Sequence, residues 1–597
     1  MAKPLQIAWA AVVLFGLGSG FGTHLHRLIR LPSWFWLPCV SGTAGLLAYA
    51  LFYVSFVSPN AGRLASVLCW GTSVVLFAAA LRDPAVRRTL RQRDAWLPAL
   101  LTALLTTSYL ASAIASDAPV DHRFRFPLPP DNVLPQMFAD RIAAGTYGLG
   151  VTPPPLDADW RSSDRPPLQA ALVLATRPLR AGHADWFSQF AATICQMGWV
   201  AAFYALGRTV ALPRRYLQFV LAAAATSPFF FFNSLYTWPK LLSAWLFVTA
   251  LAMMAQLARE RPGEPRVHDE HDELGARHAP PTATSDVMAA RVSEWTPVVA
   301  AGATALALLS HGGVAFSLLA WPLLAAWWKR WRFVPPRVWL AAIAVVVLLI
   351  GPWMAYQQFY DPPGNRLLKV HLAGVEAVDA RATAPAIADT YRTLTWSGYL
   401  TGRRANLTQQ WFGTYPLPVE SPIDWVQWQQ LLHHVPLIGF LSVGYFVLLW
   451  SPPRAGLPDA SLRLIQQLTW YALGTAAVWI ALMIVPSSTL VHQGSYVMTA
   501  LLLFCAASLT AMLPPAARWT LLALHVLLFA TCYLFSTRTA MPTPVAWRPL
   551  TFVESAAALA AFFLVLRAVP DAEAPAPISE LDGHADRRSP EVDGRQR

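Results

Sequence analysis

Long apolar stretches separated by short polar ones recur along almost the whole of the 597-residue chain. A helix needs roughly 17–25 apolar residues to cross a bilayer, whereas a barrel strand alternates polar and apolar residues and crosses in about 10. These stretches are too long and too uniformly apolar for barrel strands. The pattern therefore predicts an all-α polytopic membrane protein with about 13–15 transmembrane helices.

The candidate spans follow one another from end to end of the chain. They lie near residues 5–21, 35–57, 62–81, 96–115, 186–207, 216–232, 241–257, 296–310, 314–328, 338–355, 435–450, 465–486, 495–513, 519–535 and 551–567. The first span has the apolar character of a signal peptide. It lacks a small-x-small cleavage site and many spans follow it, so we expect a retained helix.

Basic residues fall on alternate turns between these spans. The strongest group comprises Arg82, Arg87, Arg88, Arg91 and Arg93, and others lie near residues 24–30, 208–215, 259–261, 329–337, 454–463 and 518. Because basic residues collect on the cytoplasmic side of a membrane, these turns are predicted to be cytoplasmic. The opposite side then receives two sizeable extracytoplasmic loops, 116–185 and 356–434, and the interruption near 228–240.

This orientation divides the chain into eight segments. They are N-terminal helices 1–115, a first extracytoplasmic loop 116–185, helices 186–257, a disordered cytoplasmic loop 258–295, helices 296–355, a second extracytoplasmic loop 356–434, C-terminal helices 435–567 and a disordered cytoplasmic tail 568–597. Ordered polar residues are therefore expected mainly on the outer side, and any chemistry is expected there.

The composition agrees with a membrane protein, since 55% of the residues are hydrophobic and only 13% are charged. The net charge of +12 follows from the basic turns, because the arginines lie between spans and not on one nucleic-acid-binding face. The five cysteines lack CxxC spacing, so no zinc site or disulfide framework is predicted. The stretch HDEHDELGARH in 258–295 contains metal-ligating residue types, but a solvated linker has the same composition.

Acidic residues gather in the first predicted loop. They are Asp117, Asp121, Asp131, Asp140 and Asp164. Residues 131–144 have helical spacing, with Leu134, Met137, Phe138 and Ile142 on one apolar stripe. Asp131 would open this helix, either as its N-cap or as a general base held at the membrane surface.

These elements resemble the glycosyltransferase C superfamily, in particular its aminoarabinose transferases and protein O-mannosyltransferases. The resemblance rests on PPDNVLPQMFADRIAAG and DRPPLQAAL, and continues in SPFFFFNSLYTWPKLLSAWLFVTALAMM, AGATALALLSHGGVAFSLLAWPLLAAWW with His311 at its turn, GPWMAYQQFYDPPGNRLLKVHLAG and LVHQGSYVMTALLLF. It covers about residues 117–510. Two features depart from the family pattern. Lys240 stands where an acidic residue is common, and four spans precede the acidic loop where the family usually has one.

The resemblance implies a glycosyltransferase-C-like bundle and a membrane glycosyltransferase. Such an enzyme would move a sugar from a polyprenyl-phosphate-linked donor to an envelope lipid, glycan or protein acceptor, on the outer face of a bacterial-type cytoplasmic (inner) membrane. The acidic residue of the family's first loop matches Asp131, which would be catalytic, with Asp117 and Asp121 as alternatives. No cofactor is indicated, although a divalent metal would be compatible. The expected partners are the lipid-linked donor and membrane lipids, not nucleic acid.

A phosphate leaving group needs cations around it in a partly dehydrated site. The candidates for contacting the donor phosphate or substrate are Arg165, Lys240, Arg366, Lys369, His371 and His492. Simpler roles are open for each of them: Arg165 could pair with Asp164, Lys240 could extend to the lipid headgroups, and the histidines could be structural. Asp361, which precedes two prolines, fits a turn.

Two other functions share some of these features. A lipid or polysaccharide transporter or flippase would have internal repeats and charged residues within interrupted spans, whereas here the ionisable residues, apart from Glu554, lie at loop edges. An O-antigen ligase or polymerase-like enzyme also uses lipid-linked substrates, but usually places its site in a large late loop. No Walker A, GxSxG or HExxH motif supports an ATP-driven pump or a hydrolase.

Overall fold

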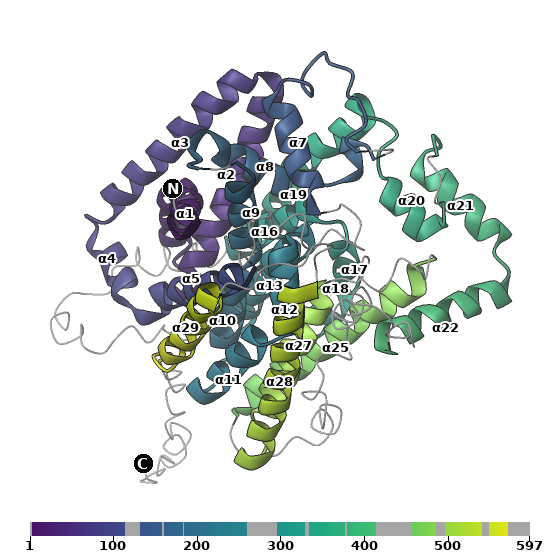
Figure 1. Cartoon of the computed structure of the whole chain (residues 1–597). Coiled ribbons are helices and arrows are strands. Elements are labelled where there is room, and N and C mark those ends of the chain that lie inside the picture. Colours follow the sequence, from purple (N-terminus) through teal and green to yellow (C-terminus); the bar gives the residue numbers. More distant parts are fainter. Residues whose placement is uncertain are drawn as a thin grey trace, which may run out of the picture.

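The computed structural model describes residues 3–113, 132–157, 160–182, 184–259, 295–328, 334–375, 379–412, 457–484, 496–539 and 549–570. Within these ranges the regular elements are helices, and an isolated bridge joins Asp157 and Trp160 (Figure 1). Seven of the described helices are long and apolar enough to cross a membrane, or up to eight if one bent pair counts as a span. The described part of the chain is thus all-helical, with several helices able to span a membrane, as the apolar pattern predicted. The predicted number of about 13–15 spans stays a prediction.

The N-terminal helices pack around α1. Their bounds are Lys3–Ile29 for α1, Ser33–Phe35 for the 3-10 turn η1, Trp36–Val57 for α2, Pro59–Ala80 for α3, Pro84–Arg91 for α4 and Arg93–Ala113 for α5. A side chain added at Gly18 or Gly22 would collide with the backbone of α2 around Val40, and one at Gly20 would collide with α3 at Ser73. Small residues four apart allow membrane helices to approach closely, so the glycines of α1 let it contact two neighbours at once.

Two turns predicted to be cytoplasmic are helical. The span predicted at 5–21 continues to Ile29, which is buried, so His24, His26 and Arg27 belong to α1. The arginine-rich segment after α3 forms α4, whose N-cap Asp83 accepts a hydrogen bond from the backbone N–H of Ala85 at 2.8 Å. Arg88 and Arg91 lie in the last turn of α4, where the helix dipole favours positive charge.

The first predicted loop contains short helices. They are α7 (Leu134–Ala143), η3 (Ser162–Asp164), α8 (Leu168–Thr176) and η4 (Arg177–Leu179). The apolar stripe of α7 is confirmed, since Leu134, Phe138 and Ile142 are buried. The N-cap interpretation of Asp131 is wrong, because α7 begins at Leu134 and its N-cap is Val133. Pro135 lies in the first turn, where its fixed φ favours a helix start.

The central part of the bundle consists of five helices, and the chain bends sharply on both sides of α12. They are α9 (Ala184–Gln196), α10 (Trp199–Thr209), α11 (Arg214–Ala225), α12 (Pro228–Tyr236) and α13 (Pro239–Arg259). Helices α11 and α12 are bent by 58° at their junction. Before α13 the chain turns at Thr237, whose φ of 54° is left-handed. Buried amides stabilise this break: Gln169 Nε2 donates to Thr237 O at 2.6 Å, and Gln196 Oε1 accepts from the backbone N–H of Leu242 at 2.7 Å.

The next helices lead from the bundle into the second predicted loop. They are α16 (Thr296–Ser310), α17 (Val314–Leu319), α18 (Trp321–Trp327), α19 (Pro336–Ala355) with the π-helical turn η6 (Tyr356–Tyr360), α20 (Arg366–Ala373), α21 (Thr383–Thr393) and α22 (Trp396–Phe412). The span predicted at 314–328 is divided at Ala320 into α17 and α18. The second loop is thus helical over much of its described length.

The last described helices are α25 (Asp459–Leu482), α27 (Tyr496–Thr510), α28 (Pro515–Thr539) and α29 (Pro549–Leu566). Helix α22 caps the C-terminus of α25, because Asn406 Nδ2 donates to the carbonyl oxygens of Ile480 at 3.1 Å and Met483 at 2.6 Å. The span predicted at 435–450 lies outside the described residues, as do residues 260–294 and 571–597.

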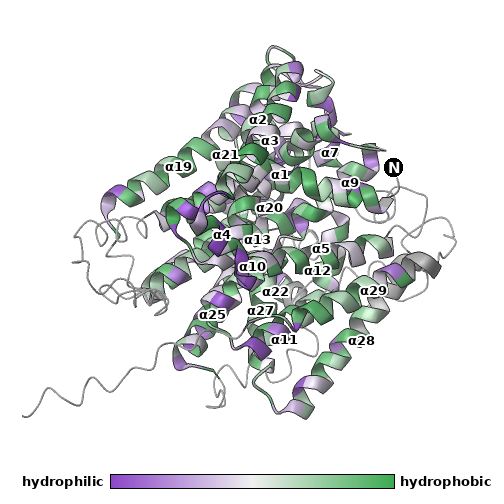
Figure 2. Cartoon of the chain, turned by 90° about the vertical axis from the view of Figure 1, so that its left-hand side faces the viewer, coloured by the Kyte–Doolittle hydropathy of each residue, from purple (hydrophilic) through white to green (hydrophobic). Residues whose placement is uncertain are grey.

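Exposed apolar side chains identify the helices at the periphery of the bundle. Leu64 and Val75 on α3 are 62% and 67% exposed, and Leu340 and Val347 on α19 are 66% and 62% exposed. Hydrophobic colour covers most of α19 in Figure 2, whereas α4 is mainly hydrophilic. Since apolar side chains are not favoured in water, these surfaces fit contact with lipid.

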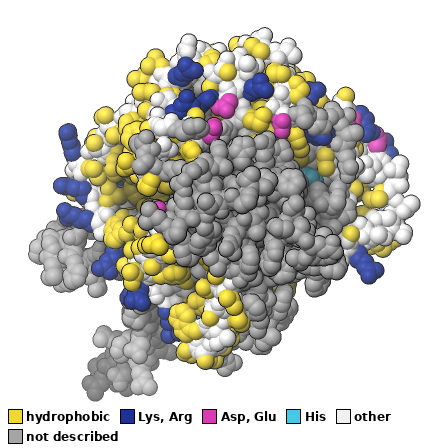
Figure 3. All heavy atoms as spheres, in the orientation of Figure 1, with side chains coloured by type: hydrophobic (Ala, Val, Ile, Leu, Met, Phe, Trp, Pro, Cys, Tyr) yellow, Lys and Arg dark blue, Asp and Glu magenta, His cyan; other side chains and the backbone are white. Residues whose placement is uncertain are grey.

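Contacts between distant segments define two ends of the bundle. At one end, which we call the basic end, Arg27 pairs with Asp83 at 2.7 Å and Arg208 pairs with Asp94 at 2.9 Å. At the other end, which we call the loop end, Trp9 Nε1 donates to Leu179 O at 2.7 Å. Basic side chains also gather along the left edge of the molecule in Figure 3, where Figure 1 places α3 and α4.

Candidate functional site

The two predicted loops meet at the loop end through the carboxylate of Asp361. Its Oδ2 atom accepts hydrogen bonds from Ser162 Oγ at 2.7 Å and from the backbone N–H of Ser163 at 3.1 Å, and Oδ1 lies 3.4 Å from Arg161 Nη1. Ser162 Oγ also lies 2.6 Å from Tyr356 OH. Asp361 therefore does more than form a turn, because it joins the first loop to the end of α19.

Asp164 makes a second connection between the loops. One carboxylate oxygen accepts the backbone N–H of Arg161 at 2.9 Å, and the other accepts the backbone N–H of Arg366 at 3.2 Å. Burial raises the pKa of Asp164 above its usual value, while these hydrogen bonds and the nearby Arg366 and Arg165 oppose that shift. The carboxylate thus holds the start of α20 against η3.

Trp160 lies between two of the predicted cations. The guanidinium carbons of Arg165 and Arg366 each lie 4.7 Å from the centroid of its ring. Arg165 belongs to the first loop and is buried, with 7% exposure, whereas Arg366 is the first residue of α20 and is partly buried. An aromatic face attracts a guanidinium group, so one indole ring fixes two cations from different loops.

Lys240 is buried within the protein at the start of α13, with 1% exposure. Its ammonium nitrogen lies 3.7 Å from the ring centroid of Trp238 and 5.4 Å from that of Tyr496. The interpretation that Lys240 extends to the lipid headgroups is therefore wrong, since a side chain that reached the headgroups would be exposed on the surface of the bundle. A cation in the first turn of a helix is also disfavoured by the helix dipole.

His311 lies near three of the predicted cationic residues. It follows the last residue of α16, and Ser310 Oγ donates to Pro239 O at 2.8 Å, so the turn lies beside the start of α13. Burial lowers the pKa of His311, and the charges of Lys240, Arg165 and His371 lower it further. Three predicted cationic residues therefore lie within electrostatic reach of one imidazole ring.

The hydrogen bonding of His311 defines its tautomer. The backbone N–H of Gly313 donates to Nδ1 at 3.0 Å, so Nδ1 must be unprotonated. A neutral imidazole then carries its proton on Nε2, where it is a hydrogen-bond donor. The cluster formed by Arg165, Lys240, His311 and His371, which we call the cationic cluster, thus combines positive charges with a neutral N–H donor.

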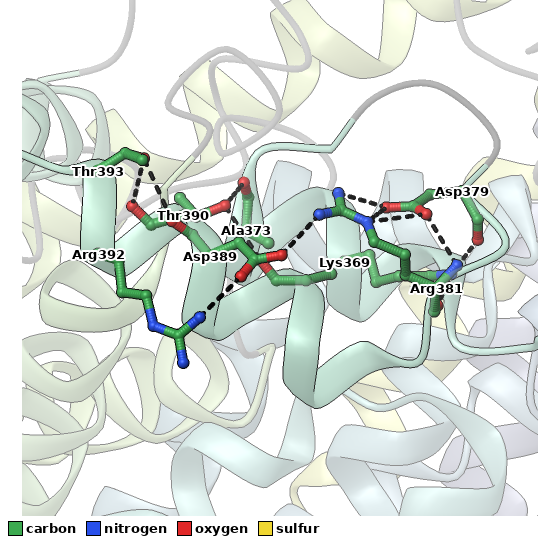
Figure 4. A network of polar contacts seen from close by, with 9 residues as sticks. Lys369, Ala373, Asp379, Arg381, Asp389, Thr390, Arg392 and Thr393 are labelled. Carbon is green, nitrogen blue, oxygen red and sulfur yellow. Dashed lines mark hydrogen bonds and ion pairs between the residues drawn. The ribbon is translucent and has the colours of Figure 1, made fainter.

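Lys369 has a different environment from the other predicted cations. Its ammonium group donates to the carbonyl oxygens of Asp379 and Arg381, the latter at 3.0 Å. Arg381 in turn pairs with Asp379 at 2.7 Å and with Asp389 on α21 at 2.9 Å, as Figure 4 shows. Two of the three N–H donors of Lys369 are therefore used to hold α20 against the loop before α21.

A largely apolar cavity of about 990 Å³ lies among α1, α2, α5, α8, α9, α10, α13 and α29, and its lining includes one ionisable residue, Glu554 on α29. Leu168 and Leu242 line it, and they follow Arg165 and Lys240 by three and two residues. The hydroxyl groups of Thr102 and Thr106 in its wall donate to carbonyl oxygens of their own helix, at 2.7 Å and 2.6 Å. The cavity is therefore largely apolar. Two of its lining residues are close in sequence to Arg165 and Lys240 of the cationic cluster.

Of the predicted site residues, Asp117, Asp121, Asp131 and His492 lie outside the described residues. Among the others, the structure places Arg165, Lys240 and His371 around His311, and Arg366 with Arg165 on Trp160. The sequence did not assign a role to Trp160, Trp238 or Tyr496. The available signal was that Trp238 lies two residues before Lys240. Within the described residues no group of three or more His, Cys, Asp or Glu side chains could hold a metal ion.

The fold and this site define a multi-pass helical membrane protein with a buried cationic cluster at its loop end. No family model, curated protein or solved structure matches the chain in the comparisons made.

Proposed function

We propose that the protein is a membrane glycosyltransferase that moves a sugar from a polyprenyl-phosphate-linked donor to an envelope lipid, glycan or protein acceptor at the loop end. The observation that supports this most is the burial of Arg165, Lys240 and His371 around His311. Cations held close together in a buried site attract an anionic ligand, because the low local dielectric strengthens the attraction. A phosphate group is the anion that would combine a lipid carrier with such a site.

Local geometry adds to the attraction for an anion. Lys240 and Arg366 both lie in the first turns of helices, α13 and α20, where the backbone dipole already favours negative charge. Arg165 can contact phosphate through a planar guanidinium fork, whereas Lys240 acts as a point charge. Nε2–H of His311 supplies a neutral donor. Such an arrangement would stabilise a phosphate that gains charge as its bond to the sugar breaks.

The neighbouring apolar cavity supports a lipid-linked substrate over a soluble one. Its 990 Å³ lies among membrane helices, and apolar side chains make up most of its lining. A polyprenyl chain is a hydrocarbon and needs no hydrogen-bond partners in such a cavity. Its burial there is favoured by the hydrophobic effect. The phosphate would then lie at the cationic cluster and the sugar on the side of the two loops.

In the transfer, the acceptor oxygen bonds to the sugar carbon while the bond from that carbon to the donor phosphate oxygen breaks. The acceptor hydroxyl loses its proton in this step, so the transfer also needs a base. The carboxylates of Asp164 and Asp361 already accept hydrogen bonds that join the loops. We therefore retain Asp131 as the proposed base, with Asp117 and Asp121 as alternatives. Its replacement by Asn should abolish sugar transfer while leaving expression and donor binding unchanged.

The donor site can be tested by binding, separately from turnover. The full-length protein in lipid nanodiscs should bind a long-chain polyprenyl phosphate, and Lys240→Met or Arg165→Met should weaken that binding about 10–100-fold, since each charged hydrogen bond contributes about 1.5–3 kcal/mol. Arg392→Gln, which removes an arginine whose side chain is 77% exposed on α21, is the charge-matched control. Equal affinity for the uncharged polyprenol would contradict the proposal.

Two further outcomes distinguish the alternatives. Mass spectrometry of envelope lipids and glycans with and without the protein should reveal a product that depends on it. If the intact lipid-linked sugar is instead recovered in the opposite leaflet, with its glycosidic bond unbroken, the protein is a transporter or flippase. A polysaccharide whose attachment or length alone changes would support the ligase or polymerase function.

A further inference from the structure

A second basic pocket lies at the basic end, between α11, α28 and α29. Its volume is about 310 Å³. Three arginines line it, one from each helix region: Arg215, Arg518 and Arg567. The remaining described lining is apolar or uncharged and contains no carboxylate: Gln218, Phe219, Ala222, Ala511, Trp519, Leu522, Phe563 and Leu566. The pocket therefore combines a cationic rim with an apolar wall.

Contacts around the pocket hold its three walls together. Gln218 Nε2 donates to Leu566 O at 3.1 Å, and Arg214 donates to Arg567 O, so α11 is joined to the end of α29. Phe219 packs edge-on against Trp519 with ring centroids 6.2 Å apart, which joins α11 to α28. The rim is thus built from tertiary contacts and is not a run of basic residues in one turn.

The arginines are placed where an anion is favoured and where solvent or lipid can reach them. Arg215 and Arg518 lie in the first turns of α11 and α28, whose dipoles favour negative charge. Arg215 and Arg567 are exposed, and Trp519 beside them is 56% exposed. The guanidinium carbon of Arg518 lies 5.8 Å from the Trp519 ring centroid, and an indole at this level of a membrane helix is typical of the lipid–water interface.

We propose that this pocket binds the headgroup of an anionic phospholipid, with one acyl chain along the apolar wall formed by α11, α28 and α29. Charge complementarity selects a negatively charged headgroup, because three arginines face the pocket and no described lining residue is acidic. The apolar wall and the exposed indole select a lipid over free phosphate, which has no acyl chain. Basic pockets between membrane helices on the cytoplasmic side are suited to such headgroups. This proposal is independent of the glycosyltransferase proposal.

Native mass spectrometry of the full-length protein in detergent tests this site. Titration with phosphatidylglycerol and phosphatidylcholine of the same acyl chains should show about tenfold or greater preference for the anionic lipid. The triple variant Arg215→Gln, Arg518→Gln and Arg567→Gln should weaken phosphatidylglycerol binding about 100-fold, since each surface arginine contributes a factor of about 5. The control variant Arg82→Gln, Arg87→Gln and Arg91→Gln removes the same charge at the same end, outside the pocket, and should bind like the wild type.

Each of the following outcomes would contradict the proposal. Equal losses in the two triple variants would mean that net charge alone attracts the lipid. Full displacement of phosphatidylglycerol by millimolar inorganic phosphate would mean that the site takes a free anion. A lipid preference that emerges only after deletion of residues 571–597 would mean that the acidic tail of the chain is the occupant. Single arginine variants, which are less disruptive, should each give a partial loss, and unchanged binding in all three would also exclude the site.

Discussion

The carboxylate of Asp361 accepts a hydrogen bond of 2.7 Å from the hydroxyl group of Ser162, which lies 199 residues earlier in the chain. This bond joins the first loop to the second at the loop end. Arg165 of the cationic cluster follows Ser162 by three residues, and α20 with Arg366 and His371 follows Asp361. The position of the cluster therefore depends on the junction between the loops.

Replacement of Asp361 by Asn should weaken that junction. The amide retains one acceptor oxygen but loses the charge that strengthens the bonds from Ser162 and Ser163. We expect the free energy of unfolding to fall by about 2 kcal/mol, measured by circular dichroism in a denaturant titration of the detergent-solubilised protein. Asp389→Asn, which weakens two exposed ion pairs, with Arg381 and Arg392, should cost less than about 1 kcal/mol. Similar costs for both variants would contradict the role given to Asp361.

Replacement of Trp160 by Leu should release the guanidinium groups of Arg165 and Arg366 without removing either charge. Each cation–π contact contributes about 0.5–2 kcal/mol, so we expect polyprenyl phosphate binding to weaken about 5–30-fold, with Trp160→Phe intermediate. The control is Trp396→Leu, since that residue is 72% exposed on α22. Unchanged affinity in Trp160→Leu would show that the arginines need no aromatic support.

Asp164 makes the stability of the protein depend on pH in a defined direction. Burial raises its pKa in the folded state, so ionisation of Asp164 disfavours the fold. The stability associated with the protonated carboxyl is present at low pH and is lost as pH rises through the raised pKa. The melting temperature of the wild type minus that of Asp164→Asn should therefore decrease from about pH 4 to about pH 7. A difference that is constant or grows over this range would contradict the assignment.

The pair formed by Asp94 and Arg208 should be the most sensitive contact at the basic end. Their side chains are 12% and 6% exposed and lie 2.9 Å apart, and Tyr204 also donates to Asp94. Arg208→Met leaves a buried carboxylate without this partner and should lower the free energy of unfolding by about 3–5 kcal/mol. The double variant Asp94→Asn, Arg208→Met should recover part of that loss in the same denaturant titration. If the double variant is as unstable as the single one, then lost packing and not the uncompensated charge is the cause.

The hydrophobic pattern predicted the helices well because each helix satisfies its backbone hydrogen bonds within its own segment. All the predicted spans within the described residues have a helix at the expected place, from α1 to α29. The errors lie at polar segments: His24, His26 and Arg27 continue α1, and the start of α7 is displaced from Asp131 to Leu134. Polar residues are compatible with both a turn and the end of a helix, so their composition does not decide between them.

The sequence by itself determined that the protein is a multi-pass helical membrane protein, and it selected most of the cations that the structure brings together. Apolar length and residue type are local properties, and they can be read along the chain. Only the tertiary structure decided that Lys240 lies buried within electrostatic reach of His311 while Lys369 donates to the carbonyl oxygens of Asp379 and Arg381. Only the tertiary structure joined Arg215, Arg518 and Arg567 around one pocket. These environments depend on contacts between segments hundreds of residues apart, and no local pattern records which segments will meet.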